Sequence, residues 1–212
     1  MKLIQKNLSK NQYHNDIQPK RIVVLHHTAG SSALSSINWW EQTAERVATS
    51  VVVDRDGTIY QAFPFDRWAS HLGIKQTVFN KFGVPNINTR LDQISIGIEI
   101  ANWGELTKKG DKFYTYTNSE IDKKNVQEYP QGFRGSKYYE KYTPEQIESV
   151  KELLILFNQQ FGIKLDYYPS MWETNSEALR GFWGIWTHVS FRPDKNDCHP
   201  QPDMISMLKS LK

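Results

Sequence analysis

Cysteine is nearly absent from this sequence: its 212 residues include a single one, Cys198. One cysteine cannot form an internal disulfide, so the fold does not depend on an oxidising compartment. The thiol therefore has another role, either as a small buried side chain or as a chemical group in a functional site.

The sequence also lacks long hydrophobic runs and a strong charge of one sign. No stretch approaches the length of a membrane span, and residues 1–10 carry positive charge without the apolar run of a signal peptide. We therefore expect no membrane insertion, and synthesis in the cytoplasm without a signal peptide. The 26 basic and 23 acidic residues leave a net charge of only +3, which does not favour nucleic acid as a partner.

Apolar side chains make up 39% of the residues and aromatic ones 13%, enough to build a substantial core. Strand-like runs and helical patterns follow one another along the chain, the strands at 21–25, 50–53, 58–62 and 95–101, and the helices at about 36–46, 144–161 and 202–211. This order predicts an α/β fold, a single domain over residues 1–212 with a central mixed β-sheet flanked by helices. Residues 103–142 are polar and aperiodic, and we expect a loop-rich elaboration there.

The helix over 144–161 carries the clearest boundary signals. Thr143 is a typical N-cap, Pro144 suits the first helical position and Gln146 stands where a capping box places it. Gly162 is expected to end the helix.

Histidine and cysteine occur at three places where a metal site could form: His26-His27 at the end of a predicted strand, His188, and Cys198-His199. Neighbouring side chains of an extended chain point to opposite sides, so each doublet is expected to supply one ligand. A set of two histidines and one cysteine leaves the fourth position of zinc open for water, which is the catalytic arrangement. A nucleophilic Cys198 activated by His188 is the alternative, and it leaves the strand-end histidines without a role.

A carboxylate stands within the predicted strand over 95–101. Its isoleucines alternate with Ser95, Gly97 and Glu99, so Glu99 faces away from the apolar side. The small residues on the same face predict room for a ligand beside it.

Five segments resemble, in the same order, the motif blocks of the zinc-dependent N-acetylmuramoyl-L-alanine amidases, the family related to peptidoglycan recognition proteins and phage amidase endolysins. They are residues 23–29, 54–61, 69–73, 95–100, and 187–188 with 197–200. The resemblance implies a peptidoglycan-recognition-protein-like fold and hydrolysis of the amide between N-acetylmuramic acid and L-alanine in peptidoglycan. We also expect a monomer, because nothing in the sequence suggests a large apolar interface. The protein is expected to reach the cell wall after release or delivery, as a phage or prophage endolysin or as a toxin delivered by secretion machinery.

Carried over block by block, the resemblance makes His26, His188 and Cys198 the ligands of Zn2+. The final ligand in this family is cysteine or aspartate. His27 is then a supporting or core histidine, and His199 is expected to face solvent.

The resemblance also suggests the catalytic and substrate-binding residues. Glu99 matches the general base of some members, and His71 matches a position that lines the substrate cleft. Phage members have a tyrosine near the position of Thr49, which we expect to contact substrate, and a lysine two residues before the final ligand. Counted from Cys198 that place holds Asn196, with Lys195 one residue further back as the candidate to stabilise the oxyanion.

Three other functions remain open on the sequence alone. A recognition module would bind peptidoglycan in the same cleft without hydrolysing it, and a cytoplasmic enzyme would recycle muropeptides. A cysteine peptidase would use Cys198 and His188 without a metal.

Overall fold

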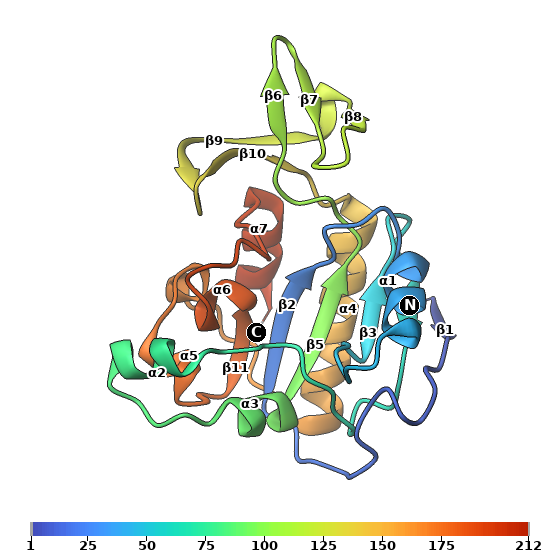
Figure 1. The fold of residues 1–212 in the computed structure, drawn as a ribbon, viewed down its shortest axis with the longest axis vertical. Helices are drawn as coiled ribbons and strands as arrows, with labels where there is room; N and C mark the ends of the chain where they lie inside the picture. The colour runs from blue at the N-terminus through green and yellow to red at the C-terminus, as the bar shows by residue number, and fades with distance from the viewer. Residues whose placement is uncertain (1, 212) are drawn as a thin grey trace.

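The computed structural model describes residues 2–211, and its central feature is a six-stranded mixed β-sheet with the order β1-β4-β3-β5-β2-β11 (Figure 1). The strands β2, β5, β11 and β3 are parallel, whereas β3 and β4 form the antiparallel hairpin predicted from the sequence. The bounds are β1 Leu3–Gln5, β2 Ile22–His27, β3 Val51–Val53, β4 Ile59–Gln61, β5 Ser95–Ile100 and β11 Gly184–Thr187. The predicted fold class is confirmed.

Helices cover both faces of this sheet. Val51 and Val53 pack into the larger core, which includes residues of α4 (Pro144–Phe161) and α7 (Pro202–Ser210), whereas Val52 packs into the smaller core with Ile37 and Trp40 of α1 (Ala33–Gln42). Figure 1 shows α4 behind β3 and β5. This double covering explains why the central strands are continuously apolar.

Short helices fill the connections between the main elements. They are α2 Gln76–Phe82, α3 Asn88–Ile94, η1 Lys123–Asn125, η2 Pro169–Trp172, α5 Ser176–Leu179 and α6 His188–Phe191. Within residues 2–211, none of the helices has both the length and the apolar character needed to cross a membrane.

The elaboration predicted over 103–142 contains strands of its own, which the sequence did not reveal. They are β6 Thr107–Lys109, β7 Lys112–Tyr114, β8 Glu120–Ile121, β9 Val126–Phe133 and β10 Ser136–Glu140. The strands β6–β8 form one small sheet and β9–β10 another, both above the carboxyl ends of β2 and β5 (Figure 1). Most of their residues are exposed or only partly buried, so they lack the hydrophobic alternation by which a strand is recognised. We call residues 103–140 the excursion.

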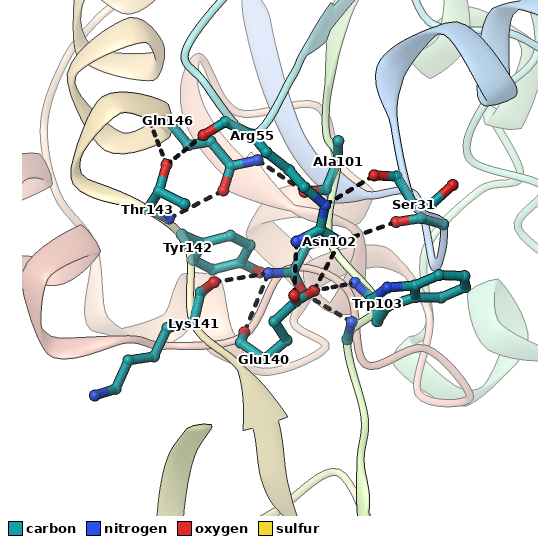
Figure 2. A network of polar contacts seen from close by, with 12 residues as sticks. Ser31, Arg55, Ala101, Asn102, Trp103, Glu140, Lys141, Tyr142, Thr143 and Gln146 are labelled. Atoms are coloured by element: carbon teal, nitrogen blue, oxygen red, sulfur yellow. Dashed lines mark hydrogen bonds and ion pairs between the residues drawn. The ribbon is translucent and has the colours of Figure 1, made fainter. Parts of the chain in front are cut away.

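A buried polar network ties both ends of the excursion to the sheet (Figure 2). The Arg55 guanidinium donates to both carboxylate oxygens of Glu140 at 2.6 and 3.0 Å, and the Trp103 backbone N–H donates to the same carboxylate at 2.7 Å. Arg55 also donates to the carbonyls of Gly30 and Ser31, in the loop that follows β2. The excursion is therefore held against that loop by charge-assisted hydrogen bonds.

The caps of α4 match the sequence prediction. The Thr143 hydroxyl accepts from the Gln146 N–H at 3.1 Å, and the Gln146 side-chain oxygen accepts from the Thr143 N–H at 3.0 Å. Gly162 ends the helix in the left-handed conformation, with φ of +69°, which costs glycine little. α1, in contrast, begins three residues before the predicted start at 36, because Ser32 caps it by accepting from the Ser35 N–H.

Replacing Thr143 with alanine removes the cap of α4 and the hydrogen bond from its hydroxyl to the Arg55 carbonyl at 2.9 Å. We expect the free energy of unfolding to fall by about 1–2 kcal/mol, measured by urea denaturation. Thr143→Ser keeps the hydroxyl and should lose much less. Equal stability of the alanine and serine variants would contradict this role for the hydroxyl.

Candidate active site

Three metal-binding side-chain atoms meet at the carboxyl edge of the sheet. His26 Nδ1 lies 3.1 Å from His188 Nδ1 and 3.1 Å from Asp197 Oδ2, and His188 Nδ1 lies 2.9 Å from the same carboxylate oxygen. His26 is near the end of β2, and His188 follows the neighbouring parallel strand β11. Because parallel strands end at the same edge, residues far apart in the sequence are brought together there.

The second ring nitrogen of each histidine is already hydrogen-bonded. His188 Nε2 lies 2.9 Å from the Leu72 carbonyl oxygen, to which it can only donate. The proton is therefore on Nε2, and the lone pair of His188 Nδ1 points at the cluster.

A chain of hydrogen bonds does the same for His26. Its Nε2 lies 3.0 Å from His71 Nδ1, His71 Nε2 lies 2.8 Å from the Ser95 hydroxyl, and that hydroxyl donates to the Leu91 carbonyl at 2.6 Å. Since the carbonyl only accepts, each donor in turn must point along this chain towards it. His26 Nδ1 is thus left as an acceptor, which is the state that a metal ligand requires.

Burial keeps these groups in their metal-binding protonation states. Loss of solvent, with the neighbouring His188, lowers the pKa of His26 to about 4, and burial also lowers the pKa of His71 well below its usual value. Burial opposes ionisation of Asp197, but the neighbouring histidines hold its pKa well below its ordinary value. The cluster therefore presents a neutral His26 imidazole and the Asp197 carboxylate, with Nδ1 of His188 beside them.

These donors fit a divalent transition metal. Zinc takes imidazole nitrogen at about 2.0–2.1 Å and carboxylate oxygen at about 2.0–2.2 Å, so tetrahedral ligands lie roughly 3.4 Å apart. The three observed separations, 2.9–3.1 Å, are slightly shorter than this. Three protein ligands also leave a fourth position, as catalytic zinc sites do.

The structure places Asp197, and not Cys198, beside the two histidines, which corrects the predicted ligand set. The Cys198 thiol is fully buried and donates to the Tyr142 hydroxyl at 2.9 Å. Burial raises its pKa far above the ordinary value, so the group is a neutral thiol and not the thiolate that binds metal. A cysteine nucleophile would need His188 beside Cys198 as its base. His188 faces Asp197 instead, so the structure does not contain this pair.

The Tyr142 hydroxyl organises the interior behind the cluster. It accepts from the Cys198 thiol and from the His199 N–H at 3.1 Å, and its proton is left for His27 Nδ1, also at 3.1 Å. The expectation that His199 faces solvent is wrong: its ring is fully buried and stacks on Tyr142 at 4.4 Å. His27 and His199 therefore serve as buried supports of the end of β2, which carries His26, and of the loop that carries Asp197.

A cleft of about 710 Å³ opens over the cluster, lined by His26, His188 and Asp197 together with Glu99, Lys195, His71 and Thr49. Its walls also include residues of the loop after β2, of α1 and of the excursion. Six of the seven residues predicted for the site thus line one cavity, and Cys198 lies behind it.

Glu99 lies opposite His26 in the pairing of β5 with β2, so both side chains project from the same face of the sheet. Its Oε2 atom is buried and has no hydrogen-bond partner among the described residues. Burial, with the negative charge of Asp197, raises the pKa of Glu99 to about 8. A carboxyl group with these properties is suited to exchange a proton with a ligand in the cleft.

The space expected over Gly97 is filled by protein. A β-carbon at Gly97 would lie 2.5 Å from Thr49 Cγ2 and 3.2 Å from His71 Nδ1, so glycine is required for these side chains to approach the strand. The Thr49 hydroxyl donates to the Val51 carbonyl. A substrate contact by Thr49 or His71 stays a prediction, while His71 visibly orients His26.

Asp197, Ser95 and Tyr142 have roles that the sequence analysis missed. Asp197 carried a signal, because Lys195 stands two residues before it, the spacing between the lysine and the final ligand in the phage enzymes. Two residues before Cys198 stands Asn196, which departs from that pattern. Two residues before Asp197 stands Lys195, which matches it. Ser95 and Tyr142 carried no comparable signal.

Solved structures share this fold of a mixed sheet covered by helices. PlyL superposes with a TM-score of 0.56 at 14% identity over 99% of this chain and 98% of that one. The PlyG catalytic domain gives 0.57 at 13% identity over 99% and 94%, and a mutant endolysin from Bacillus subtilis gives 0.54 at 17% identity over 99% and 97%. No curated protein matches the sequence.

The sequence model of the N-acetylmuramoyl-L-alanine amidases matches residues 16–202, and the chain belongs to this family. The protein is an N-acetylmuramoyl-L-alanine amidase, a hydrolase acting on peptidoglycan, and the predicted family and activity are confirmed. The recognition module without activity and the cysteine peptidase are set aside.

Replacing Tyr142 with phenylalanine keeps the ring stacked on His199 but removes the hydroxyl shared by His27, Cys198 and the His199 N–H. We expect a loss of about 1–3 kcal/mol in the free energy of unfolding, because the buried N–H then lacks a partner. Denaturant unfolding of the variant measures this. Tyr114→Phe, on the partly exposed strand β7, is the matched control, and a similar loss there would contradict the assignment.

Proposed function

We propose that the protein is a zinc-dependent amidase whose metal ligands are His26, His188 and Asp197. The observation that carries this proposal is the convergence of two histidine Nδ1 atoms and one carboxylate oxygen in the cleft. When bound, zinc would polarise the carbonyl of the amide and lower the pKa of a water molecule to about 7.

Glu99 is the proposed general base and acid. Its buried, unpartnered oxygen on the face shared with His26 can take a proton from the attacking water and deliver it to the departing alanine nitrogen. Lys195 lines the same cleft two residues before Asp197, and we assign it to the negative charge that develops on the carbonyl oxygen.

His71 and Ser95 are proposed to act through His26. Their hydrogen bonds keep the proton on His26 Nε2 and turn Nδ1 towards the cluster, in the way that outer groups orient metal-binding histidines. The proposed assignment of His71 is therefore to ligand orientation as well as to the cleft wall.

We further propose an endolysin role, in which a monomer degrades the cell wall. The shared fold with an endolysin from Bacillus subtilis supports this role. The test is mass spectrometry of products from purified peptidoglycan, with zinc-loaded protein beside a chelated control. Stem peptides with a free N-terminal alanine, released only with metal, are expected; activity in the chelated sample would remove zinc from the mechanism.

The proposed ligand set predicts different results for substitutions of the adjacent residues Asp197 and Cys198. Asp197→Ala should lower zinc affinity by more than about 100-fold and abolish hydrolysis, because it removes a direct ligand. Cys198→Ala should retain zinc, since the thiol is engaged with Tyr142. Metal content after dialysis against a weak chelator measures both, and loss of zinc from the cysteine variant alone would restore Cys198 as the ligand.

Glu99→Gln preserves the shape of the side chain but cannot exchange the proton. We expect kcat to fall by about 10²–10⁴-fold while bound zinc stays at the wild-type level. Glu128→Gln, at an exposed position of β9, is the matched control and should keep full activity. A Glu99→Gln enzyme that hydrolyses peptidoglycan at the wild-type rate would show that another group is the base.

A further inference from the structure

Two aromatic side chains in the cleft wall are largely exposed. Tyr116 is 70% exposed and Trp39 is 59% exposed, and both line the cavity that contains the candidate zinc ligands. Trp39 belongs to α1, whereas Tyr116 belongs to the turn between β7 and β8 of the excursion. Exposed aromatic surface gathered in a cleft is typical of a binding site.

Two other exposed aromatic residues, Phe182 and Trp183, do not line the cleft. The Arg21 guanidinium lies 4.8 Å from the centroid of the Trp183 ring, so that ring has a cationic partner. Phe182 is 55% exposed but does not line the cleft. Phe182 is therefore a useful comparison for an exposed ring without a site.

The position of Tyr116 is set by the structure beneath it. The turn is closed by hydrogen bonds from the Asn118 N–H to the Thr115 carbonyl and from the Thr115 N–H to the Ser119 carbonyl. The Trp103 ring packs edge-on against Tyr116, with centroids 5.7 Å apart. The backbone of Trp103 is in turn fixed by Glu140, within the network of Figure 2, so the tyrosine ring is held in place before any ligand arrives.

The same wall also carries hydroxyl groups. Ser35 and Ser36 of α1 line the cleft beside Trp39. Ring faces next to hydroxyl groups match a sugar, because a pyranose presents C–H groups on its faces and hydroxyl groups around its rim. Tyrosine and tryptophan combine an apolar body with a polar tip, which suits such an amphipathic ligand.

The substrate has a glycan side and a peptide side, and the aromatic wall fits the glycan side better. The peptide begins at alanine, whose methyl group offers little surface to two rings. The glycan side begins at muramic acid and continues as a chain of amino sugars. The excursion adds one of the two rings, so the site extends beyond the sheet that carries the catalytic cluster.

We propose that Tyr116 and Trp39 form an aromatic subsite that binds the glycan strand beyond the muramic acid at the scissile bond. This subsite rests on the proposed function, because it names the part of the substrate that the same cleft recognises. Such a subsite makes the enzyme prefer amide bonds on intact glycan strands over those on a single sugar. The excursion contributes to this preference because it carries Tyr116.

The kinetic test compares two substrates. One is a glycan tetrasaccharide carrying stem peptides, and the other is N-acetylmuramoyl-peptide with its single sugar. For Tyr116→Ala we expect KM on the tetrasaccharide to rise about three- to tenfold, with kcat unchanged and no rise in KM on the single sugar. Phe182→Ala, which removes an exposed ring outside the cleft, is the control and should change KM on neither substrate.

Two results would overturn the subsite. An unchanged KM on the tetrasaccharide would show that Tyr116 binds no sugar, and an equal rise on both substrates would assign the ring to the muramic acid or the peptide. Because Tyr116 is exposed, unchanged thermal unfolding of the alanine variant is expected and excludes loss of fold as the cause.

A binding measurement separates this proposal from the proposed function. A peptide-free glycan tetrasaccharide is titrated into wild type and Tyr116→Ala, with calorimetry as the readout, and the variant should bind about three- to tenfold more weakly. If the wild type hydrolyses neither substrate, the proposed zinc mechanism fails while this difference in binding still decides the subsite. Hydrolysis of both substrates with equal glycan binding by the two proteins would overturn the subsite alone.

Discussion

The site depends on two imidazole nitrogens and one carboxylate oxygen that lie 2.9–3.1 Å apart and are buried away from solvent. Such a cluster needs oriented imidazole rings, because polar groups removed from solvent must find their partners within the protein. The Leu72 carbonyl and the His71–Ser95–Leu91 chain provide the orientation. The segments that carry Leu72, His71 and Leu91 therefore hold the two imidazole rings in place.

Two groups of polar contacts stabilise different segments around the cleft. Tyr142 joins His27, Cys198 and His199 in a network whose hydrogen-bond donors and acceptors are matched, and this fixes the loop that carries Asp197. The Arg55–Glu140 pair fixes the ends of the excursion. The excursion also reaches the Asp197 loop, because the Tyr129 hydroxyl contacts His199 at 2.8 Å. The loop that carries Asp197 and the excursion are thus supported by connected hydrogen bonds in the interior.

The sequence predicted those helices and strands well whose signals lie within a few residues of one another. The capping residues of α4 and the alternation of β5 act within a few positions, so they can be read directly. The strands of the excursion escaped prediction because they are short and mostly exposed, so no hydrophobic face marks them. The candidate site residues His26, His188 and Glu99 were proposed from their motifs, and all three line the cleft.

By itself the sequence determined the family, four strands of the central sheet, the helices α1, α4 and α7, and six of the residues that line the cleft, since these follow from composition, periodicity and motif. Only the tertiary structure decided between Asp197 and Cys198, two neighbours that both suit zinc chemically. The choice depends on which side chain faces His26, which lies 162 residues from His188 and 171 residues from Asp197 in the sequence. Tertiary structure also placed Tyr116 in the wall of the cleft, because contacts between distant segments carry no local periodicity.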